Sequence, residues 1–311
     1  METLLAHIDR VDAAQWVTTI CDSNPANPIS RYSEETVLSE DVPEGWWDSC
    51  FCKFAKESQS FLDFAGKSPT SRVGFMKLKN QTVVVVGGSS GMGMGVSEAL
   101  AAEGAKVIVA SRTLEKCQQA ASKIGGLTEG RSIDMNSEEN VRSFFETIGE
   151  IHHLIIPGSA VKSGPFKTTS TEDLMDSMRS KFLGPLLCAR YARFNENASL
   201  TFFSGSLSRK PGNSSLLGAI NAAVETLAKG LAIELAPVRV NVISPGLTRD
   251  TNAFNAMPEA AREQMFSGYA KKLPVGRVGL PKDFGQAAVF LTTCNFVTGS
   301  IIDVDGGGLL V

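Results

Sequence analysis

The sequence predicts an α/β fold, in which a doubly wound parallel sheet lies between two layers of helices and follows a partly helical N-terminal extension. The first observation behind this prediction is Val83–Val86, four β-branched residues in succession. Such a run is typical of a strand buried on both faces, as in a parallel sheet. Further strand-like apolar runs follow at 106–110, 154–156 and 199–206. The third observation is a glycine-rich turn between the first run and a helical pattern.

Three glycines, Gly87, Gly91 and Gly93, follow the first predicted strand. They permit a tight turn, let the backbone approach a pyrophosphate, and let the next helix pack closely on the strand, as in a Rossmann-type dinucleotide-binding fold. The alternative is a purely structural turn, but the strand before it and the helix after it favour a binding site. The candidate contacts in this stretch are Gly87, Ser89, Ser90, Gly91, Met92 and Gly93.

The spacing of three residues between the first two glycines resembles the short-chain dehydrogenase/reductase family. Two later stretches extend the resemblance. Leu231–Gly246 is similar to the family's sixth strand and nicotinamide loop, and Thr298–Gly307 is similar to its last strand and Asp-Gly-Gly turn. The resemblance covers roughly residues 78–311. It implies one NADP-binding Rossmann domain at 76–311, after an acidic extension at 1–75.

The end of the second strand, Ser111-Arg112, bears on the choice of cofactor. In dinucleotide folds an acidic residue at this point holds the ribose 2′-hydroxyl, whereas a basic one accommodates a 2′-phosphate. Ser111 and Arg112 therefore favour NADP(H), unless Arg112 merely opens the next helix on a solvated face. The stretch Ser132–Met135 is predicted to end the third strand. The resemblance implies that Asp134, beside Met135, contacts the adenine, and the alternative is that Asp134 caps the following helix.

Further cofactor contacts are implied by the resemblance alone. At residues 157–160 the family usually has Asn-Asn-Ala-Gly and this chain has Pro-Gly-Ser-Ala, so only backbone contacts carry over there. After the sixth strand, Thr248 matches a residue that usually contacts the cofactor phosphate. The contacts implied in these two segments are Pro157, Gly158, Pro245, Gly246 and Thr248.

The catalytic positions depart from the family's pattern. Ser204 matches the catalytic serine, and a Tyr-x-x-x-Lys pair should follow thirteen residues later. This chain has Leu217 and Asn221 at those two positions. In the family the tyrosine protonates the nascent alkoxide, while the lysine lowers the tyrosine pKa and holds the ribose. Because leucine has no proton to give, ordinary carbonyl reduction by that route is not expected.

Lys181 stands where the family has its active-site asparagine, so Lys181 and Asn221 resemble an exchange of two neighbouring side chains. If they converge, Asn221 holds the nicotinamide ribose and Lys181 supplies charge or a proton, while Ser204 or Ser206 orients the substrate. The alternative is that Lys181 is solvated and Asn221 is only a remnant on a helix face.

Three functions are compatible with these residues. The first is an atypical NADP(H)-dependent reductase that acts on an iminium or activated double bond, as some secondary-metabolism members lacking Tyr and Lys do. The second is a non-redox cyclase, isomerase or dehydratase, and the third is a catalytically inactive binding protein on the same fold. Residues 257–272 resemble the family's mobile substrate lid, which predicts a largely apolar small-molecule substrate. The predicted lining is Met257, Met265, Phe266 and Tyr269.

Composition narrows the partners and the location. The chain has 311 residues and a formal charge of −3, so no basic surplus indicates nucleic acid. We find no apolar run that predicts a membrane span, and no basic region with an apolar core that predicts a secretory signal. The six scattered cysteines are predicted to be free thiols in a cytoplasmic protein. Their spacing predicts no metal site.

Residues 1–75 differ from the rest, with twelve Asp or Glu against six Lys or Arg and all three tryptophans. The tryptophans argue against simple disorder. We predict two helical segments in an arm that covers the active-site mouth or forms a subunit interface, and the alternative is a loosely docked tail.

The long helix predicted at 217–235 has more small and apolar residues than one sheet face requires. In the family this helix commonly packs against its mate, so we expect a homodimer or homotetramer. The alternative is a monomer in which the arm covers this helix. The apolar positions are Ala219, Ala222, Ala223, Leu227, Ala228, Leu231 and Leu235.

Overall fold

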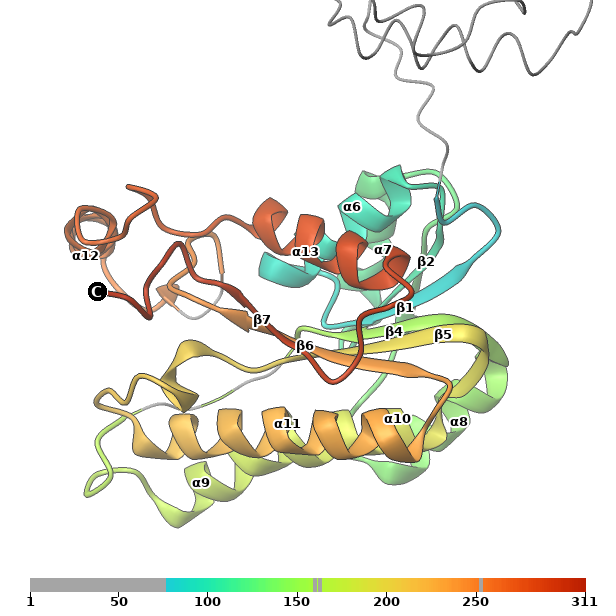
Figure 1. Cartoon of the computed structure of the whole chain (residues 1–311), viewed down its shortest axis with the longest axis horizontal. Coiled ribbons are helices and arrows are strands. Elements are labelled where there is room, and N and C mark those ends of the chain that lie inside the picture. Colours follow the sequence, from blue (N-terminus) through green and yellow to red (C-terminus); the bar gives the residue numbers. More distant parts are fainter. Residues whose placement is uncertain (1–76, 159–160, 162–163, 252–253) are drawn as a thin grey trace, which may run out of the picture. The chain divides into compact units, whose positions relative to one another are not determined.

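The computed structural model describes residues 77–158, 161, 164–251 and 254–311. It contains a seven-stranded sheet in the order β3-β2-β1-β4-β5-β6-β7, and every neighbouring pair is parallel. The predicted doubly wound sheet is therefore confirmed (Figure 1). The strands are β1 (Thr82–Val86), β2 (Lys106–Ser111), β3 (Glu129–Ser132), β4 (Glu150–Ile156), β5 (Arg193–Phe203), β6 (Arg239–Pro245) and β7 (Ile301–Val304).

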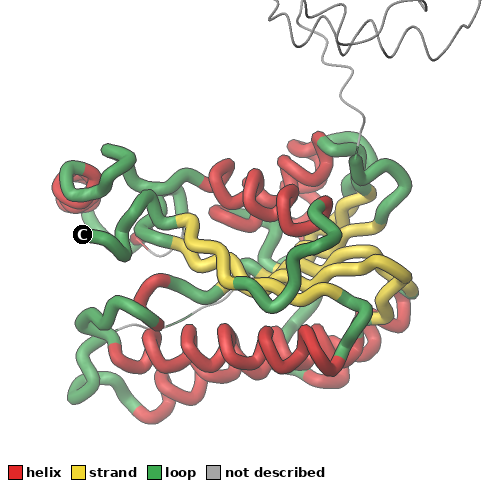
Figure 2. The backbone as a smooth tube through the Cα atoms, viewed as in Figure 1, coloured by secondary structure: helices red, strands yellow, loops and turns green. Residues whose placement is uncertain are grey.

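Helices cover both faces of the sheet, as Figures 1 and 2 show. Alternate residues of β1 supply the two cores, because successive side chains of a strand point to opposite faces. Val84 and Val86 pack with α8, α10 and α11, whereas Val83 and Val85 pack with α6, α7 and α13. The helices are α6 (Gly91–Ala102), α7 (Leu114–Ile124), α8 (Glu138–Ile148), α9 (Thr171–Met178), α10 (Gly184–Tyr191), α11 (Ser215–Glu234), α12 (Glu259–Ala270) and α13 (Pro281–Thr293).

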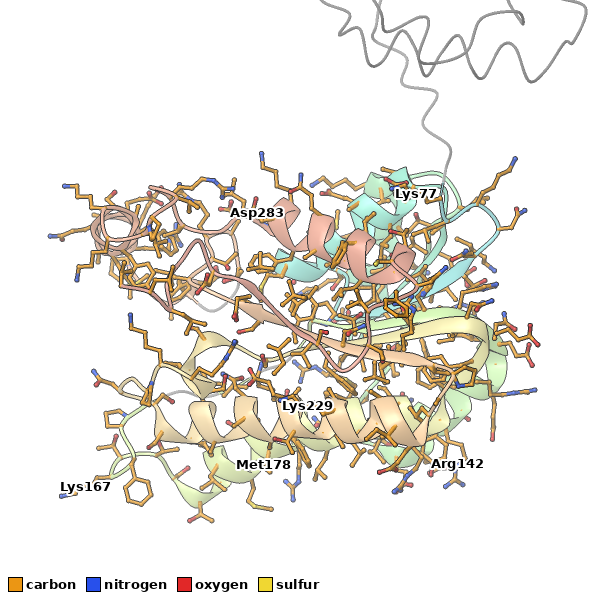
Figure 3. All side chains as sticks on the ribbon, in the orientation of Figure 1. Lys77, Arg142, Lys167, Met178, Lys229 and Asp283 are labelled. Carbon is orange, nitrogen blue, oxygen red and sulfur yellow. The ribbon has the colours of Figure 1, made fainter. Side chains whose placement is uncertain are left out.

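The order of the strands positions the site. From β1 the chain winds outward to β3, returns to β4 on the other side of β1, and winds outward again to β7. The connections therefore diverge between β1 and β4, and in such sheets ligands bind outside the carboxyl ends of the strands at this point. Charged side chains such as Arg142 and Lys167 are exposed and point away from the sheet (Figure 3).

Two predicted elements have different bounds. The third strand ends at Ser132, so Asp134 and Met135 lie beyond it. The Asp134 side chain accepts a hydrogen bond from the backbone N–H of Asn136, 3.1 Å away, and this local bond holds a turn instead of extending the strand. The alternative that Asp134 caps the next helix is also wrong, because Ser137 is the N-cap of α8.

The helix predicted from Thr171 is interrupted. A π-helical segment, Arg179–Leu183, separates α9 from α10. Lys181 lies in the middle of this segment, and π-helical turns occur frequently at functional sites.

Helix α11 has the length and composition of a membrane-spanning helix, unlike any other helix in the described part of the chain. It packs on the sheet through Ile220, Val224 and Ala228, which are all buried, so it is a core helix of the α/β layer. The extension at 1–75, with its predicted helices and its boundary, lies outside the described residues.

Candidate functional site

The glycine-rich turn meets the end of β4 at the carboxyl edge of the sheet. Gly87 has a φ of +90°, and a Cβ atom there would lie 2.3 Å from the Gly158 Cα. A Cβ on Gly93 would lie 2.0 Å from the Gly87 carbonyl oxygen. The backbones thus touch where β1 turns into α6, whose first turn contains no acidic residue. This arrangement offers the helix N-terminus to an anion such as a pyrophosphate.

Two hydroxyls and a guanidinium lie at the end of β2. Ser89 Oγ donates to Ser111 Oγ at 3.2 Å, so the two serines are brought together. Arg112 is exposed, and its guanidinium makes no hydrogen bond or ion pair with another described residue. An exposed arginine that follows Ser111 in the chain fits a 2′-phosphate, because Arg binds phosphate oxygens with its fork of N–H groups.

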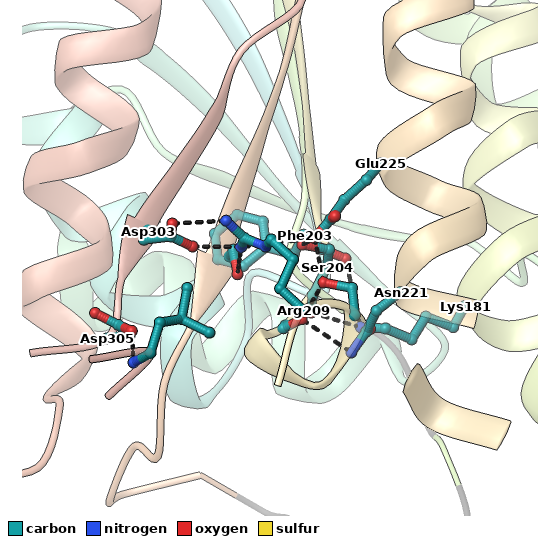
Figure 4. A network of polar contacts seen from close by, with 12 residues as sticks. Lys181, Phe203, Ser204, Arg209, Asn221, Glu225, Asp303 and Asp305 are labelled. Carbon is teal, nitrogen blue, oxygen red and sulfur yellow. Dashed lines mark hydrogen bonds and ion pairs between the residues drawn. The ribbon is translucent and has the colours of Figure 1, made fainter. Parts of the chain in front are cut away.

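Lys181 and Asn221 converge on the end of β5, as Figure 4 shows. Lys181 Nζ donates to the carbonyl oxygens of Ser204 at 3.1 Å and Phe203 at 3.4 Å. Asn221 Nδ2 donates to the next carbonyl, that of Gly205, at 3.2 Å. The two side chains therefore bind three successive carbonyl groups, and the alternative of a solvated Lys181 is wrong, since only 8% of it is exposed.

The burial of Lys181 has an electrostatic consequence. Removal of the ammonium from water disfavours its charged form and lowers the pKa of Lys181 to about 8. The group is then able to hold or release a proton within two pH units of neutrality.

Asn221 presents an unpaired acceptor. Its side-chain oxygen Oδ1 is buried and has no hydrogen-bond partner among the described residues. Buried polar groups are nearly always paired, so an orphaned oxygen at the carboxyl edge of the sheet marks a place for a ligand donor. Gly205 leaves room for this side chain, because a Cβ there would lie 2.9 Å from Asn221 Nδ2. These residues fit a nicotinamide dinucleotide, whose hydroxyl groups are hydrogen-bond donors.

A charged network supports Ser204. Ser204 Oγ donates to Glu225 Oε1 at 2.8 Å, and Ser208 Oγ donates to the same oxygen at 2.7 Å. Arg209 Nη2 lies 3.8 Å from this carboxylate oxygen. Arg209 also binds both carboxylate oxygens of Asp303 on β7, and these hydrogen bonds raise the pKa of Arg209 (Figure 4).

The other predicted residues lie around these groups. Leu217 is half-buried one turn before Asn221 on α11, and Ser206 begins a short 3-10 turn, Ser206–Ser208, with no side-chain hydrogen bond to a described residue. Thr248 is buried and donates to the Gly246 carbonyl at 3.0 Å. Pro157 precedes Gly158, and Pro245 precedes Gly246, at the ends of β4 and β6.

The predicted lid corresponds to α12 in part. Phe266 is buried rather than lining a cavity, and it packs edge-to-face on Phe254 with ring centroids 5.5 Å apart. Arg249 lies over the same ring at 5.5 Å and binds Glu263. The helix thus has a small core of its own.

Comparison with known proteins identifies the family. The family model described as enoyl-(acyl carrier protein) reductase matches residues 86–308. The chain belongs to the short-chain dehydrogenase/reductase family. A short-chain dehydrogenase/reductase of Stachybotrys chlorohalonatus, ATR9, is 29% identical over 255 residues, which are 75% of this chain and 98% of that protein.

Two solved short-chain structures are similar in fold and sequence. A small-chain dehydrogenase in complex with NADPH is 36% identical with a TM-score of 0.64, covering 74% of this chain and all but 1% of that one. An NADPH-bound short-chain oxidoreductase from Pseudomonas aeruginosa PAO1, described as containing an atypical catalytic center, is 28% identical with a TM-score of 0.68. The match covers 74% of this chain and 97% of that structure.

Two residues of the candidate site, Glu225 and Arg209, were not predicted from the sequence. One signal pointed to Glu225, which is the acidic residue one helical turn after Asn221 in an otherwise apolar stretch of α11. No comparable signal marked Arg209, because its partners lie on α11, β6 and β7. Only the folded chain brings these segments together.

Proposed function

We propose that this short-chain family member is an NADPH-dependent reductase that acts on an iminium or activated double bond. One observation carries the proposal. The helix position that holds the family's acid is occupied by Leu217, which has no proton to donate, whereas the glycine turn and Asn221 have the chemistry to bind the cofactor. An iminium carbon accepts hydride without a proton donor, because the nitrogen only regains its lone pair.

The choice of NADPH over NADH is supported by Arg112 and the Ser89–Ser111 pair at the end of β2. It is supported too by the two similar structures described with NADPH. When bound, NADPH supplies the hydride. The glycine turn holds the pyrophosphate, and Asn221 Oδ1 accepts from the nicotinamide ribose.

Lys181 is proposed to move the proton that an activated alkene requires at its second carbon. Its backbone bonds to Phe203 and Ser204 use two of the three ammonium protons. The third is available, and a pKa of about 8 permits transfer near neutral pH.

Single-turnover mixing tests the redox step. The NADPH-loaded protein is mixed with cyclic iminium ions and activated alkenes, and we expect loss of NADPH absorbance with deuterium transfer from 4-deuterated cofactor to product. Leu217→Met is the matched control and should react like the wild type, because position 217 gives no proton. Unchanged absorbance with bound cofactor would contradict the proposal. Product without NADPH consumption would indicate a non-redox enzyme, and binding without product a scaffold.

We also propose that the protein is a homodimer or homotetramer assembled through α11. Ile233 on this helix is 80% exposed, and Gly230, Leu231 and Ala232 come directly before it. Light scattering at micromolar concentration should give a mass of two or four times the 33.2 kDa of one chain. A mass equal to one chain would contradict the proposal.

A further inference from the structure

We propose that Glu225 is a positioning residue that converts the Ser204 hydroxyl into a hydrogen-bond acceptor, so that the site prefers a cationic N–H group over a neutral ligand of the same shape. This inference deepens the proposed function and rests on its placement of the substrate at the end of β5. The observations that carry it are the contacts of Ser204, the charges around Glu225 and the absence of another donor at position 217.

Every hydrogen of Ser204 that can be donated is already committed. Its backbone N–H donates to the Ile243 carbonyl at 2.9 Å, and its hydroxyl proton goes to Glu225 Oε1 at 2.8 Å. Its own carbonyl accepts from Lys181 at 3.1 Å. A hydroxyl has one proton and two lone pairs, so Ser204 Oγ retains only acceptor capacity. A neutral carbonyl substrate needs a hydrogen-bond donor, and the Ser204 hydroxyl does not supply one.

The carboxylate behind this hydroxyl is not fully neutralised by its neighbours. Arg209 is the nearest cation to Glu225 Oε1, at 3.8 Å, yet its two terminal nitrogens bind Asp303 in a bidentate pair. Such pairs take the guanidinium's strongest hydrogen bonds. Glu225 keeps two hydroxyl donors, from Ser204 and Ser208. The negative charge therefore acts through Ser204 on any group that donates to its oxygen.

Lys181 is the group that opposes a second cation at this point. Its Nζ lies against the backbone carbonyls of Phe203 and Ser204 rather than against a carboxylate. Burial has already lowered its pKa to about 8, so an incoming cation displaces its proton at smaller cost than from an exposed lysine. Among the titratable groups around Ser204, Lys181 and Glu225 contact it directly and Arg209 lies beside Glu225, while Asp303 and Asp305 act on Arg209.

An iminium N–H complements this arrangement. It donates to Ser204 Oγ, and the Glu225 charge lies one hydrogen bond further on. When hydride adds to the iminium carbon, a C–H bond forms and the C=N π electrons become the nitrogen lone pair. The amine is neutral as it forms, and because it is a stronger base than the imine it then takes up a proton from solvent.

Equilibrium binding to the protein–NADP⁺ complex tests the inference without turnover. Three probes with the same bicyclic ring skeleton are compared at pH 6 by ligand-observed NMR: 3,4-dihydroisoquinolinium, N-methyl-3,4-dihydroisoquinolinium and neutral 1,2-dihydronaphthalene. The first has the charge and the N–H, the second only the charge, and the third neither. We expect the N–H cation to bind at least about tenfold more tightly than the neutral probe, as a hydrogen bond to a charged group allows. The N-methyl cation should lie between them.

Glu225→Gln and Ser208→Ala form the matched pair of variants. Glu225→Gln keeps the shape and an amide oxygen but removes the charge, so the preference for the N–H cation should fall about tenfold. Ser208→Ala removes the other donor to the same oxygen and leaves the Ser204 bond in place, so the preference should persist. NADP⁺ affinity is measured for each variant to show that the fold is intact. Should Glu225→Gln lose NADP⁺ binding, Ser204→Ala replaces it, because it deletes the acceptor itself.

The double variant shows whether Glu225 acts through the serine. In a Ser204→Ala background, Glu225→Gln should no longer change the difference between the N–H and N-methyl cations. Equal affinity of the three probes in the wild type would overturn the inference, as would an equal loss of preference in Ser208→Ala and Glu225→Gln. If the preference is present but no probe is reduced by NADPH, the inference stands and the proposed function fails.

Discussion

The buried part of β5, residues 198–203, has a polar network at each end, and the two networks differ in one respect. At the amino end, Ser199 Oγ lies 2.7 Å from His153 Nδ1, and His153 Nε2 lies 2.7 Å from Gln81 Oε1. Each of these atoms has a partner. At the carboxyl end, Asn221 Oδ1 has none within the described residues, and Ser204 retains free lone pairs. A closed network holds the fold together, whereas an open one is available to a ligand.

The closed network fixes the charge of His153. Gln81 Oε1 can only accept, so Nε2 carries the proton and Nδ1 accepts from Ser199. Burial, with Arg239 and His152 nearby, lowers the pKa of His153 to about 3. A serine beside a histidine suggests a nucleophile and its base, but Ser199 is fully buried and the pair lies at the edge opposite the glycine turn. Because both ring nitrogens of His153 have a partner, we assign the Ser199–His153 pair a structural role.

The largest expected effect is the loss of stability in acid that the neutral His153 at the closed end causes. Well above pH 6.5, the ordinary pKa of histidine, His153 is neutral in both folded and unfolded chains. As the pH falls from 6.5 toward 3, only the unfolded chain takes up the proton, so the free energy of unfolding decreases, by on the order of 4 kcal/mol over the window. Chemical denaturation of the wild type and of His153→Gln at pH 7, 5 and 4 measures this. The stability difference between them should shrink as the pH falls, and a constant difference would contradict the neutral histidine.

His153→Leu should destabilise the protein at neutral pH by about 3 kcal/mol, because the buried Ser199 hydroxyl and the half-buried Gln81 amide oxygen both lose their partner. Under conditions in which His153→Leu is folded, its NADPH affinity should equal that of the wild type. Urea unfolding and cofactor titration give the two values. A large loss of affinity would show that this end of β5 is coupled to the site.

At the open end, Arg112→Ser should lower NADPH affinity by roughly ten- to a hundredfold, since a charge-assisted bond to the 2′-phosphate is removed. Affinity for NADH should hardly change, because NADH lacks that phosphate. Titration of both cofactors against wild type and variant gives the ratio. Arg131→Ser is the control, as Arg131 on the neighbouring strand pairs with Glu129. Equal losses for NADPH and NADH would contradict the assignment.

The fold followed from the sequence more readily than the site did. Runs such as Val83–Val86 and the glycines after them are local signals, and they gave the strands and the turn. The meeting of Lys181 and Asn221 was predictable only through the family's register. The Asp134 turn depends on a side-chain hydrogen bond within the turn, and the Glu225–Arg209 ion pair joins two separate segments. Neither contact produces a periodic pattern in the sequence, so neither could be predicted from it.

The smallest effect should come from Asn221→Leu, and it distinguishes the two networks most directly. The substitution removes an oxygen that has no partner, which favours folding, but it leaves the Gly205 carbonyl without its donor, which opposes it. These contributions are similar in size, so stability should stay within about 1 kcal/mol of the wild type. NADPH affinity should nevertheless fall about tenfold, because the ribose loses its acceptor. Ser199→Ala is the mirror-image control, with lower stability and unchanged affinity. If Asn221→Leu behaved like Ser199→Ala, the orphaned oxygen would have no ligand to serve and the open end of β5 would be structural as well.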